Sequence, residues 1–403
     1  EGAFLQDGQG AVSTAGDITT TDDSVTFNSA VTLTGAVAID TGAGAGTVAF
    51  NDTLDGAQTL GLTAGTGDIN FDGIVGGTSA LGAVTINSAT DVTAGLAFNA
   101  ASLRQVAGSG TTTFTDALTT TAAAGIEIDG TNVDFNDTVS LTLGDLDVDA
   151  TGTVRFNGLV TTSDVNNGLV TISNGGQLTM TSTGDMGLEG AFLQDGQGAV
   201  STAGDITTSN DNVTLQSATT LSGSVAIDAG ATGDVIMVNP DNDFNKKIFV
   251  TGNEISVLAK DVIEVQISAH GNTDIVSGGR LTVNGTLGQS SDLALTSETD
   301  ILFGNLSVQG DLQSVTRGPG TSGGVLQKAN TALSVHGAST FTADIGKDQV
   351  ATLTRSDNDF VGPVTFNDAN DGNWVSISIV DKNNLTLGDV TATGNLNATA
   401  ATD

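Results

Sequence analysis

Residues 1–40 read EGAFLQDGQGAVSTAGDITTTDDSVTFNSAVTLTGAVAID, and residues 189–228 read EGAFLQDGQGAVSTAGDITTSNDNVTLQSATTLSGSVAID. The first twenty residues of the two copies are identical, so the phrase that opens at Glu1 opens again at Glu189. Self-similarity of this kind is typical of proteins built from structural repeats. Because the first copy opens abruptly at Glu1, we expect the chain to be a processed product or a piece of a longer repeat array.

A shorter period lies inside the long one. Phe114, Phe135 and Phe156 follow one another at one constant interval, and each opens a similar phrase that ends in Leu or Val four positions later. Between these phrases apolar residues occupy every second position in short runs, as in Val31-Thr32-Leu33, before Gly, Asn or Asp interrupts them. This alternation predicts short strands with one buried face, closed by tight turns.

We therefore predict an all-β fold, a right-handed parallel β-helix (solenoid) with about 21 residues per coil. Parallel strands stacked ~4.8 Å apart would pair each coil with its neighbours and place Phe on Phe, Val on Val and Asn on Asn. The 54 glycines and only 3 prolines suit a chain with many turns and continuous ladders. A string of immunoglobulin-like sandwiches is the alternative, but it predicts a repeat of about 100 residues with a buried Trp or Tyr in each domain. The chain has no Tyr and one Trp, Trp374.

The chain changes character near Pro240. The copies that open at Glu1 and Glu189 define a 188-residue superrepeat. Residues 1–240 contain only two basic residues and the start of this superrepeat, so we expect a regular β-solenoid there. Residues 241–403 hold the remaining basic residues and a different repeated phrase, Asp241–Phe244 and Asp357–Phe360. We expect a less regular continuation of the solenoid in this part, with small loops at Gly318–Gly324 and Asp368–Asn373.

The charge is strongly acidic, with 46 acidic and 11 basic residues and a net charge of −35. Only six of the acidic residues are Glu; the rest are Asp, which favours turns. Such a surface repels phosphate backbones, so nucleic acid is excluded as an expected partner. No run approaches the ~20 apolar residues of a membrane-spanning helix, and there is no cysteine for disulfides, thiolate catalysis or cysteine-bound metals.

The chain resembles the filamentous-haemagglutinin-type giant exoproteins and related β-strand-repeat surface proteins of bacteria. The resemblance lies in residues 356–366, SDNDFVGPVTF, and residues 385–400, LTLGDVTATGNLNATA, and in scattered Gly-Asp-Ile and Gly-Asn-Leu strand openings. It implies export, a long β-helical shaft, and roles in adhesion, aggregation or biofilm. The secretion module and the anchor of that family are not visible in this sequence, which leaves the export route open.

No catalytic or cofactor site is predicted. Parallel β-helices include polysaccharide lyases and hydrolases, but abundant Asp at corners would meet the spacing of a glycosidase pair by accident. Only His270 and His336 are available as histidines, each before a Gly at the end of an apolar run, where an exposed turn residue is the simplest interpretation. Trp374 is read as a packed aromatic, with sugar stacking as the alternative.

Calcium is the metal that the acidic turns suggest. Asp357 and Asp359, and Asp368 and Asp371, lie in oxygen-rich turns of a kind that coordinates hard cations. Solvated turn aspartates are the simpler interpretation, since the glycine-rich nonapeptide of calcium-binding β-rolls is absent.

The expected function is thus a structural or adhesive shaft segment of a secreted bacterial cell-surface fibre, and not an enzyme. We expect self-association end to end, or stacking with neighbouring repeats of a longer chain. A carbohydrate-binding module that contacts surface glycans, and a polysaccharide-degrading enzyme, are the alternatives.

Overall fold

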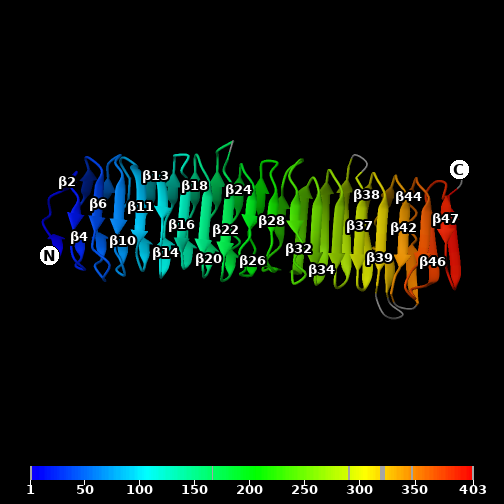
Figure 1. The fold of residues 1–403 in the computed structure, drawn as a ribbon. Coiled ribbons are helices and arrows are strands. Elements are labelled where there is room, and N and C mark those ends of the chain that lie inside the picture. Colours follow the sequence, from blue (N-terminus) through cyan, green and yellow to red (C-terminus); the bar gives the residue numbers. More distant parts are fainter. Residues whose placement is uncertain (1, 166, 289–290, 318–322, 346–347, 402–403) are drawn as a thin grey trace. The chain divides into compact units, whose positions relative to one another are not determined.

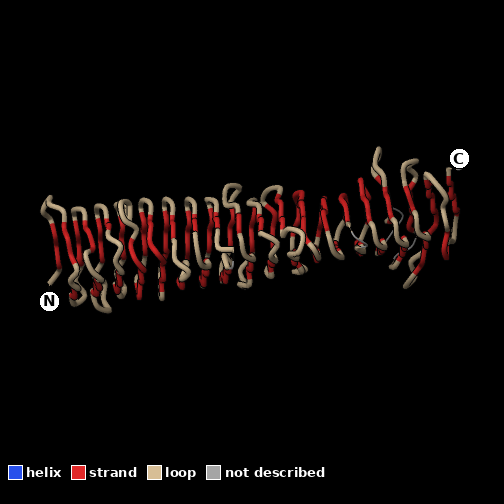
Figure 2. The backbone as a smooth tube through the Cα atoms, turned by 90° about the horizontal axis from the view of Figure 1, so that it is seen from above, coloured by secondary structure: helices blue, strands red, loops and turns tan. Residues whose placement is uncertain are grey.

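The computed structural model describes residues 2–165, 167–288, 291–317, 323–345 and 348–401, and these contain strands and turns but no helix. The chain divides into two compact units, an N-terminal unit of Glu1–Ser209 and a C-terminal unit of Asn210–Asp403. Figure 1 shows the strands of each unit lying side by side, and Figure 2 shows strands alternating with turns throughout.

The strands of the N-terminal unit are β1 (Phe4–Gln6), β2 (Val12–Thr14), β3 (Ile18–Thr19), β4 (Val25–Phe27), β5 (Val31–Leu33), β6 (Val37–Asp40), β7 (Val48–Phe50), β8 (Leu54–Asp55), β9 (Leu60–Thr63), β10 (Ile69–Phe71), β11 (Leu81–Ser88), β12 (Val92–Ala94), β13 (Phe98–Gln105), β14 (Thr111–Phe114), β15 (Leu118–Thr120), β16 (Ile126–Gly130), β17 (Asn132–Phe135), β18 (Val139–Leu141), β19 (Leu146–Ala150), β20 (Val154–Phe156), β21 (Val160–Thr162), β22 (Val170–Asn174), β23 (Leu178–Met180), β24 (Met186–Leu188), β25 (Phe192–Gln194), β26 (Val200–Thr202) and β27 (Ile206–Thr208).

The strands of the C-terminal unit are β28 (Val213–Leu215), β29 (Thr219–Leu221), β30 (Val225–Asp228), β31 (Val235–Met237), β32 (Asp243–Gly252), β33 (Ile255–Ala259), β34 (Asp261–Ala269), β35 (Thr273–Ser277), β36 (Leu281–Leu287), β37 (Leu293–Ser297), β38 (Asp300–Val308), β39 (Leu312–Thr316), β40 (Gly324–Gln327), β41 (Leu333–Val335), β42 (Ser339–Ala343), β43 (Gln349–Leu353), β44 (Asp359–Phe360), β45 (Val364–Asp368), β46 (Trp374–Asp381), β47 (Leu387–Val390) and β48 (Asn395–Ala400).

The N-terminal unit is a parallel β-solenoid with three short strands per coil over much of its length. From β14 onward each strand pairs in parallel with the third strand after it, as β14 with β17 and β17 with β20. The register aligns Phe114 with Phe135 and Phe135 with Phe156, so one coil separates each pair of these residues. The predicted parallel β-solenoid and its coil length are confirmed, and the sandwich alternative, which needs antiparallel strands, is wrong.

The interior of the N-terminal unit is a column of stacked side chains. Strand residues alternate between buried and partly or fully exposed, and the buried residues are the apolar ones, which point inward. Phe27, Phe50 and Phe71 stack with ring centroids 5.3 and 5.6 Å apart and nearly parallel planes. On the outside, the Asn51 amide donates to Asn28 Oδ1 at 2.6 Å. The predicted ladders of like residues are confirmed.

The C-terminal unit is also a parallel β-solenoid, but its coils vary in length. One coil runs from Ile255 to its register partner Thr273, whereas another runs from Leu312 to Ser339 and is half as long again. In the middle part of the unit each strand pairs with the second strand after it, as β33 with β35, because two short strands have merged into one long one. Thus β32 pairs with both β29 and β30.

The sequence predicts two small loops in this unit, Gly318–Gly324 and Asp368–Asn373. Residues 318–322 of the first loop lie outside the described residues. The second loop connects β45 with β46, and Asn370 and Asp371 take φ values of 45° and 71° there. Asn and Asp tolerate this left-handed conformation better than other side chains. The boundary predicted after residue 240 stays a prediction.

Candidate functional site

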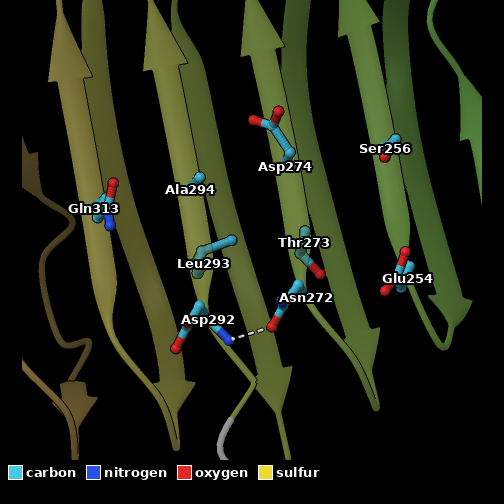
Figure 3. Close-up of a pocket in the computed structure, with 9 residues that line it drawn as sticks. All are labelled: Glu254, Ser256, Asn272, Thr273, Asp274, Asp292, Leu293, Ala294 and Gln313. Atoms are coloured by element: carbon cyan, nitrogen blue, oxygen red, sulfur yellow. Dashed lines mark hydrogen bonds between the residues drawn. The ribbon is translucent and has the colours of Figure 1, made fainter.

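A hollow of about 290 Å³ lies on the outer face of β33, β35, β37 and β39 in the C-terminal unit (Figure 3). The strands place alternate side chains outward, so neighbouring coils contribute Ser256, Asp274, Ala294 and Gln313 to one surface. Glu254, Asn272 and Asp292 line the hollow from the turns that precede the strands. The hollow is thus the regular outer face of the solenoid between rows of side chains.

The three carboxylates of this hollow do not converge. Figure 3 shows Glu254, Asp274 and Asp292 on three different coils, with the Asp274 side chain directed away from Asp292. Asp274 is exposed as a residue, but the hollow partly desolvates its carboxyl group and raises its pKa. A glycosidase needs one acid and one base placed together across a bond. The described residues of this hollow do not form such a pair.

Asp292 shows why the solenoid contains so much aspartate. Its backbone N–H donates to Asn272 Oδ1 at 3.0 Å, and its own Oδ1 accepts the N–H of Asp311 at 2.8 Å. Asp311 in turn accepts the N–H of Ala338 at 2.7 Å. Each short side chain at this corner therefore caps an amide of the next coil. The N-terminal unit repeats the device with Asp185, which accepts the N–H of Asp205 at 2.8 Å.

These caps give the acidity a structural cause. Backbone amides are strong hydrogen-bond donors, and these side chains supply an acceptor for one amide of the next coil at the exposed corners. The shorter side chain of Asp, compared with Glu, holds its oxygen next to the backbone and favours such local bonds. The result is negative charge at outer corners, as where Asp292 and Asp311 lie on adjacent coils of the C-terminal unit.

A second group of carboxylates lies on the outer face of the N-terminal unit. Register partners place Glu127 beside Asp147 and Asp129 beside Asp149 on adjacent coils. Desolvation raises the pKa of Asp147, and the negative charges of Asp149 and Glu127 raise it further. The pKa of Asp129 is raised for the same reasons, although Arg104, which pairs with Glu127 at 3.1 Å, opposes the rise.

Replacing Asp147 by Asn should stabilise the N-terminal unit at neutral pH by about 0.5 kcal/mol, the order of one exposed charge interaction. A carboxyl whose pKa is higher in the folded state binds protons more readily there, so its penalty is present at neutral pH and disappears as acid protonates it. The free energy of unfolding should therefore rise on acidification through the range above 3.8 in the original chain, and rise less in Asp147→Asn. Urea unfolding at several pH values measures both.

Asp134→Asn is the matched control for this change. Asp134 lies beside Arg155 in the register, so its loss removes an attraction and should not stabilise the unit. Added salt should shrink the gain of Asp147→Asn, since it screens exposed charges. A gain that is independent of both pH and salt would contradict the assignment to charge repulsion.

The four calcium candidates are spread over different environments. Asp359 forms an ion pair with Lys382 at 2.8 Å and accepts a hydrogen bond from Asn383, while Asp357 is exposed. Asp368 and Asp371 are exposed on the second loop. Among the described residues no group of three or more His, Cys, Asp or Glu side chains is arranged to hold a metal ion. Calcium binding stays a prediction.

The repeated phrase around these aspartates has a structural role that the sequence did not reveal. Asn242 and Asn358 are both fully buried. The Asn242 side chain accepts the N–H of Thr219 and donates to Met237 O, and Asn358 likewise accepts the N–H of Leu333 and donates to Leu353 O. Each therefore ties a corner of its own coil to a neighbouring coil. Composition does not indicate that an Asn between two Asp residues is buried. The recurrence of the Asp-Asn-Asp-Phe phrase was the only feature of the sequence that pointed to a structural role for this Asn.

The two histidines and the tryptophan that the sequence singled out have ordinary structural positions. His270 and His336 are exposed at bends that follow β34 and β41. Trp374 is 0% exposed, packs edge-on against Phe366 at 5.8 Å, and donates its indole N–H to Asn367 O. It is a core residue, so the sugar-stacking alternative is wrong.

In the part of the chain that the structure describes, no helix is both long and apolar enough to cross a membrane.

Residues 290–367 and 372–403 match the model of a family described as repeats of unknown function (DUF5649). No curated protein and no solved structure matches the chain. The matched repeats lie within the C-terminal unit and agree with a repeat-built β-solenoid.

Proposed function

We propose that the chain is a structural, non-catalytic shaft segment of a secreted bacterial cell-surface fibre of the filamentous-haemagglutinin type. One observation carries the proposal. The inward side chains of successive coils pack against one another, and corner side chains accept backbone hydrogen bonds from the next coil. Nearest-neighbour stacking of this kind stabilises a repeat protein without disulfides or a wide core. The chain has no cysteine, in accord with such a design.

The internal duplication supports growth of the shaft by addition of repeats. In the N-terminal unit the second copy begins with β25, β26 and β27, which pair with β22, β23 and β24 of the preceding coil. Phe192, Val200 and Ile206 are buried in this contact. The equivalent residues of the first copy form β1, β2 and β3. The same sequence thus forms the same strands and accepts a further coil on its edge.

Secretion and surface location belong to the proposal. Their support is the resemblance in the C-terminal unit, the acidic surface, which favours solubility of an exposed protein, and the absence of thiols. Adhesion is the role that such a shaft would serve, either through neighbouring repeats or through end-to-end self-association.

Antibody raised against the purified chain tests this directly on the bacterium that produces it. We expect intact cells to bind the antibody and to lose that binding after brief treatment with an external protease. Labelling only after permeabilisation would contradict the surface location. Incubation of the purified chain with polygalacturonate should release no new reducing ends, and their release would overturn the non-catalytic assignment.

A carbohydrate-binding role is the second candidate function. One specific feature favours it, a polar groove on the C-terminal unit where two lysines converge on a carboxylate of the lining.

A further inference from the structure

A groove of about 490 Å³ crosses the outer face of β32, β34, β36, β38 and β41. It arises where two sides of the coil merge into long bent strands. Gly285 has a φ of 138°, and a Cβ there would lie 2.0 Å from Ile267 O, so only glycine allows the bend. The register between β36 and β38 shifts at the same place, and a Cβ at Gly304 would lie 1.7 Å from Asn284 Oδ1. The bend and the missing side chains make the face concave.

The groove is lined by hydrogen-bonding groups at regular intervals. Gln266, Asn284, Thr286, Ser307 and Ser334 contribute amides and hydroxyls from successive coils. Adjacent strands lie ~4.8 Å apart, a spacing close to the length of one sugar unit. Amides and hydroxyls that fix orientation within a hollow are the usual polar elements of a small-ligand site.

Two lysines converge on Glu264, a carboxylate that lines this groove together with Lys247. Lys247 Nζ lies 3.6 Å and Lys328 Nζ 3.7 Å from the same oxygen of Glu264, which also accepts a hydrogen bond from Asn284 at 3.2 Å. Two ammonium groups and one carboxylate leave one positive charge. This local excess is unusual in a chain with a net charge of −35. In the hollow of Figure 3, by contrast, the charged residues Glu254, Asp274 and Asp292 are all acidic.

An aromatic side chain lies next to Lys247. Phe249 is 36% exposed, and Lys247 Nζ lies 4.6 Å from the centre of its ring. The register places Phe249 beside Gln266, which lines the groove. Most other phenylalanines of the described chain are buried in the ladders, so an exposed ring at this place is available to an apolar sugar face.

From these features we propose that the groove binds an acidic polysaccharide, with a hexuronate carboxylate held by Lys247 and Lys328 and the sugar ring beside Phe249. Ammonium and carboxylate form charge-assisted hydrogen bonds, which are stronger than neutral ones. Remote acidic residues oppose binding little at physiological salt, since charges farther away than about 8 Å are screened. The groove adds a ligand to the proposed shaft, and the purified chain tests it independently of where the fibre is located.

Binding of a defined oligogalacturonate to the whole chain, measured by isothermal titration, tests the proposal. We expect saturable binding that weakens as salt is raised, and a loss of about tenfold or more in affinity when Lys247 and Lys328 are both replaced by Gln. The methyl-esterified oligogalacturonide has the same sugars without the charge and should bind at least about tenfold more weakly. Phe249→Ala should also weaken binding, with the salt dependence kept.

Lys382→Gln is the matched control. Lys382 is a partly exposed lysine that pairs with Asp359 elsewhere on the unit, and its loss should leave binding unchanged. Circular dichroism and thermal unfolding of each variant check that it folds. Absence of oligogalacturonate binding, equal binding of the methyl ester, or equal loss in Lys382→Gln and in the groove variant would each overturn the proposal.

Discussion

Replacing Phe135 by alanine should lower the free energy of unfolding of the N-terminal unit by about 3–5 kcal/mol. Phe135 is fully buried, and its ring lies 5.7 Å from that of Phe114 and 5.0 Å from that of Phe156, with nearly parallel planes. The substitution removes buried apolar area and leaves a cavity that the ladders above and below cannot close, because the strands are held in register. Denaturant unfolding followed by circular dichroism measures the loss.

Leu143→Ala is the control for this prediction. Leu143 is also a large apolar residue of the N-terminal unit, but it is 42% exposed at a turn. Its truncation should cost less than about 1 kcal/mol, as surface changes usually do. Hydrogen exchange should show the effect of Phe135→Ala concentrated in the coils next to it, since each coil contacts only its neighbours. Equal effects of the two substitutions would contradict a stacked aromatic core.

Replacing Asn358 by aspartate should destabilise the C-terminal unit by about 2–4 kcal/mol at neutral pH. The two side chains have nearly the same shape, so the change alters hydrogen bonding and charge while leaving the packing volume almost the same. Asn358 Oδ1 accepts from Gln327 Nε2 at 2.6 Å and from the N–H of Leu333, and Asn358 Nδ2 donates to Gln327 Oε1 and Leu353 O. A carboxylate cannot donate a hydrogen bond. The oxygen that replaces Nδ2 would therefore lie as a buried charge against the Leu353 carbonyl, with no donor facing it.

The pH dependence separates this cause from simple misfolding. In acid the new carboxyl is protonated and donates again, so the loss of stability should shrink as pH falls. Asn397→Asp, on the exposed strand β48, should change stability by less than about 0.5 kcal/mol at any of these pH values. A loss at Asn358 that is the same in acid and at neutral pH would show that the carboxylate charge is not its cause.

The sequence predicted the coil because its repeating unit is local. Phe114, Phe135 and Phe156 recur at one spacing, and the alternation around them shows which face is buried. Where the spacing is constant, a ladder follows directly, as the Phe stacks and the Asn28–Asn51 pair show. The merging of two strands into β32 could not be predicted, because it depends on which register neighbouring coils adopt and not on residue type.

The groove was hidden from sequence reasoning for a related reason. Lys247 and Glu264 are register partners on adjacent coils, whereas Lys328 lies several coils' length further along the chain, and coils of unequal length bring it to the same place. Because the length of the coil changes along this unit, a fixed period assigns such residues to the wrong corner. The aspartates pose the opposite difficulty. The aspartates are easy to identify in the sequence. The groups that they cap are backbone N–H groups, which every residue except proline has, so the sequence does not show which residue each aspartate caps.

The fold and the proposed shaft both depend on the stacking of successive coils in parallel register. Ser140 and Thr161 are register partners on β18 and β21, and the Thr161 hydroxyl donates to Ser140 Oγ at 3.3 Å. Since the chain has no cysteine, a pair introduced as Ser140→Cys and Thr161→Cys can be followed by intact mass under mild oxidation. We predict a rapid intramolecular disulfide, because adjacent parallel strands place the two Cα atoms within bonding range. The pair Thr119→Cys and Thr161→Cys, which is separated by one further coil, should remain reduced, and a disulfide in this pair but not in the first would contradict the solenoid.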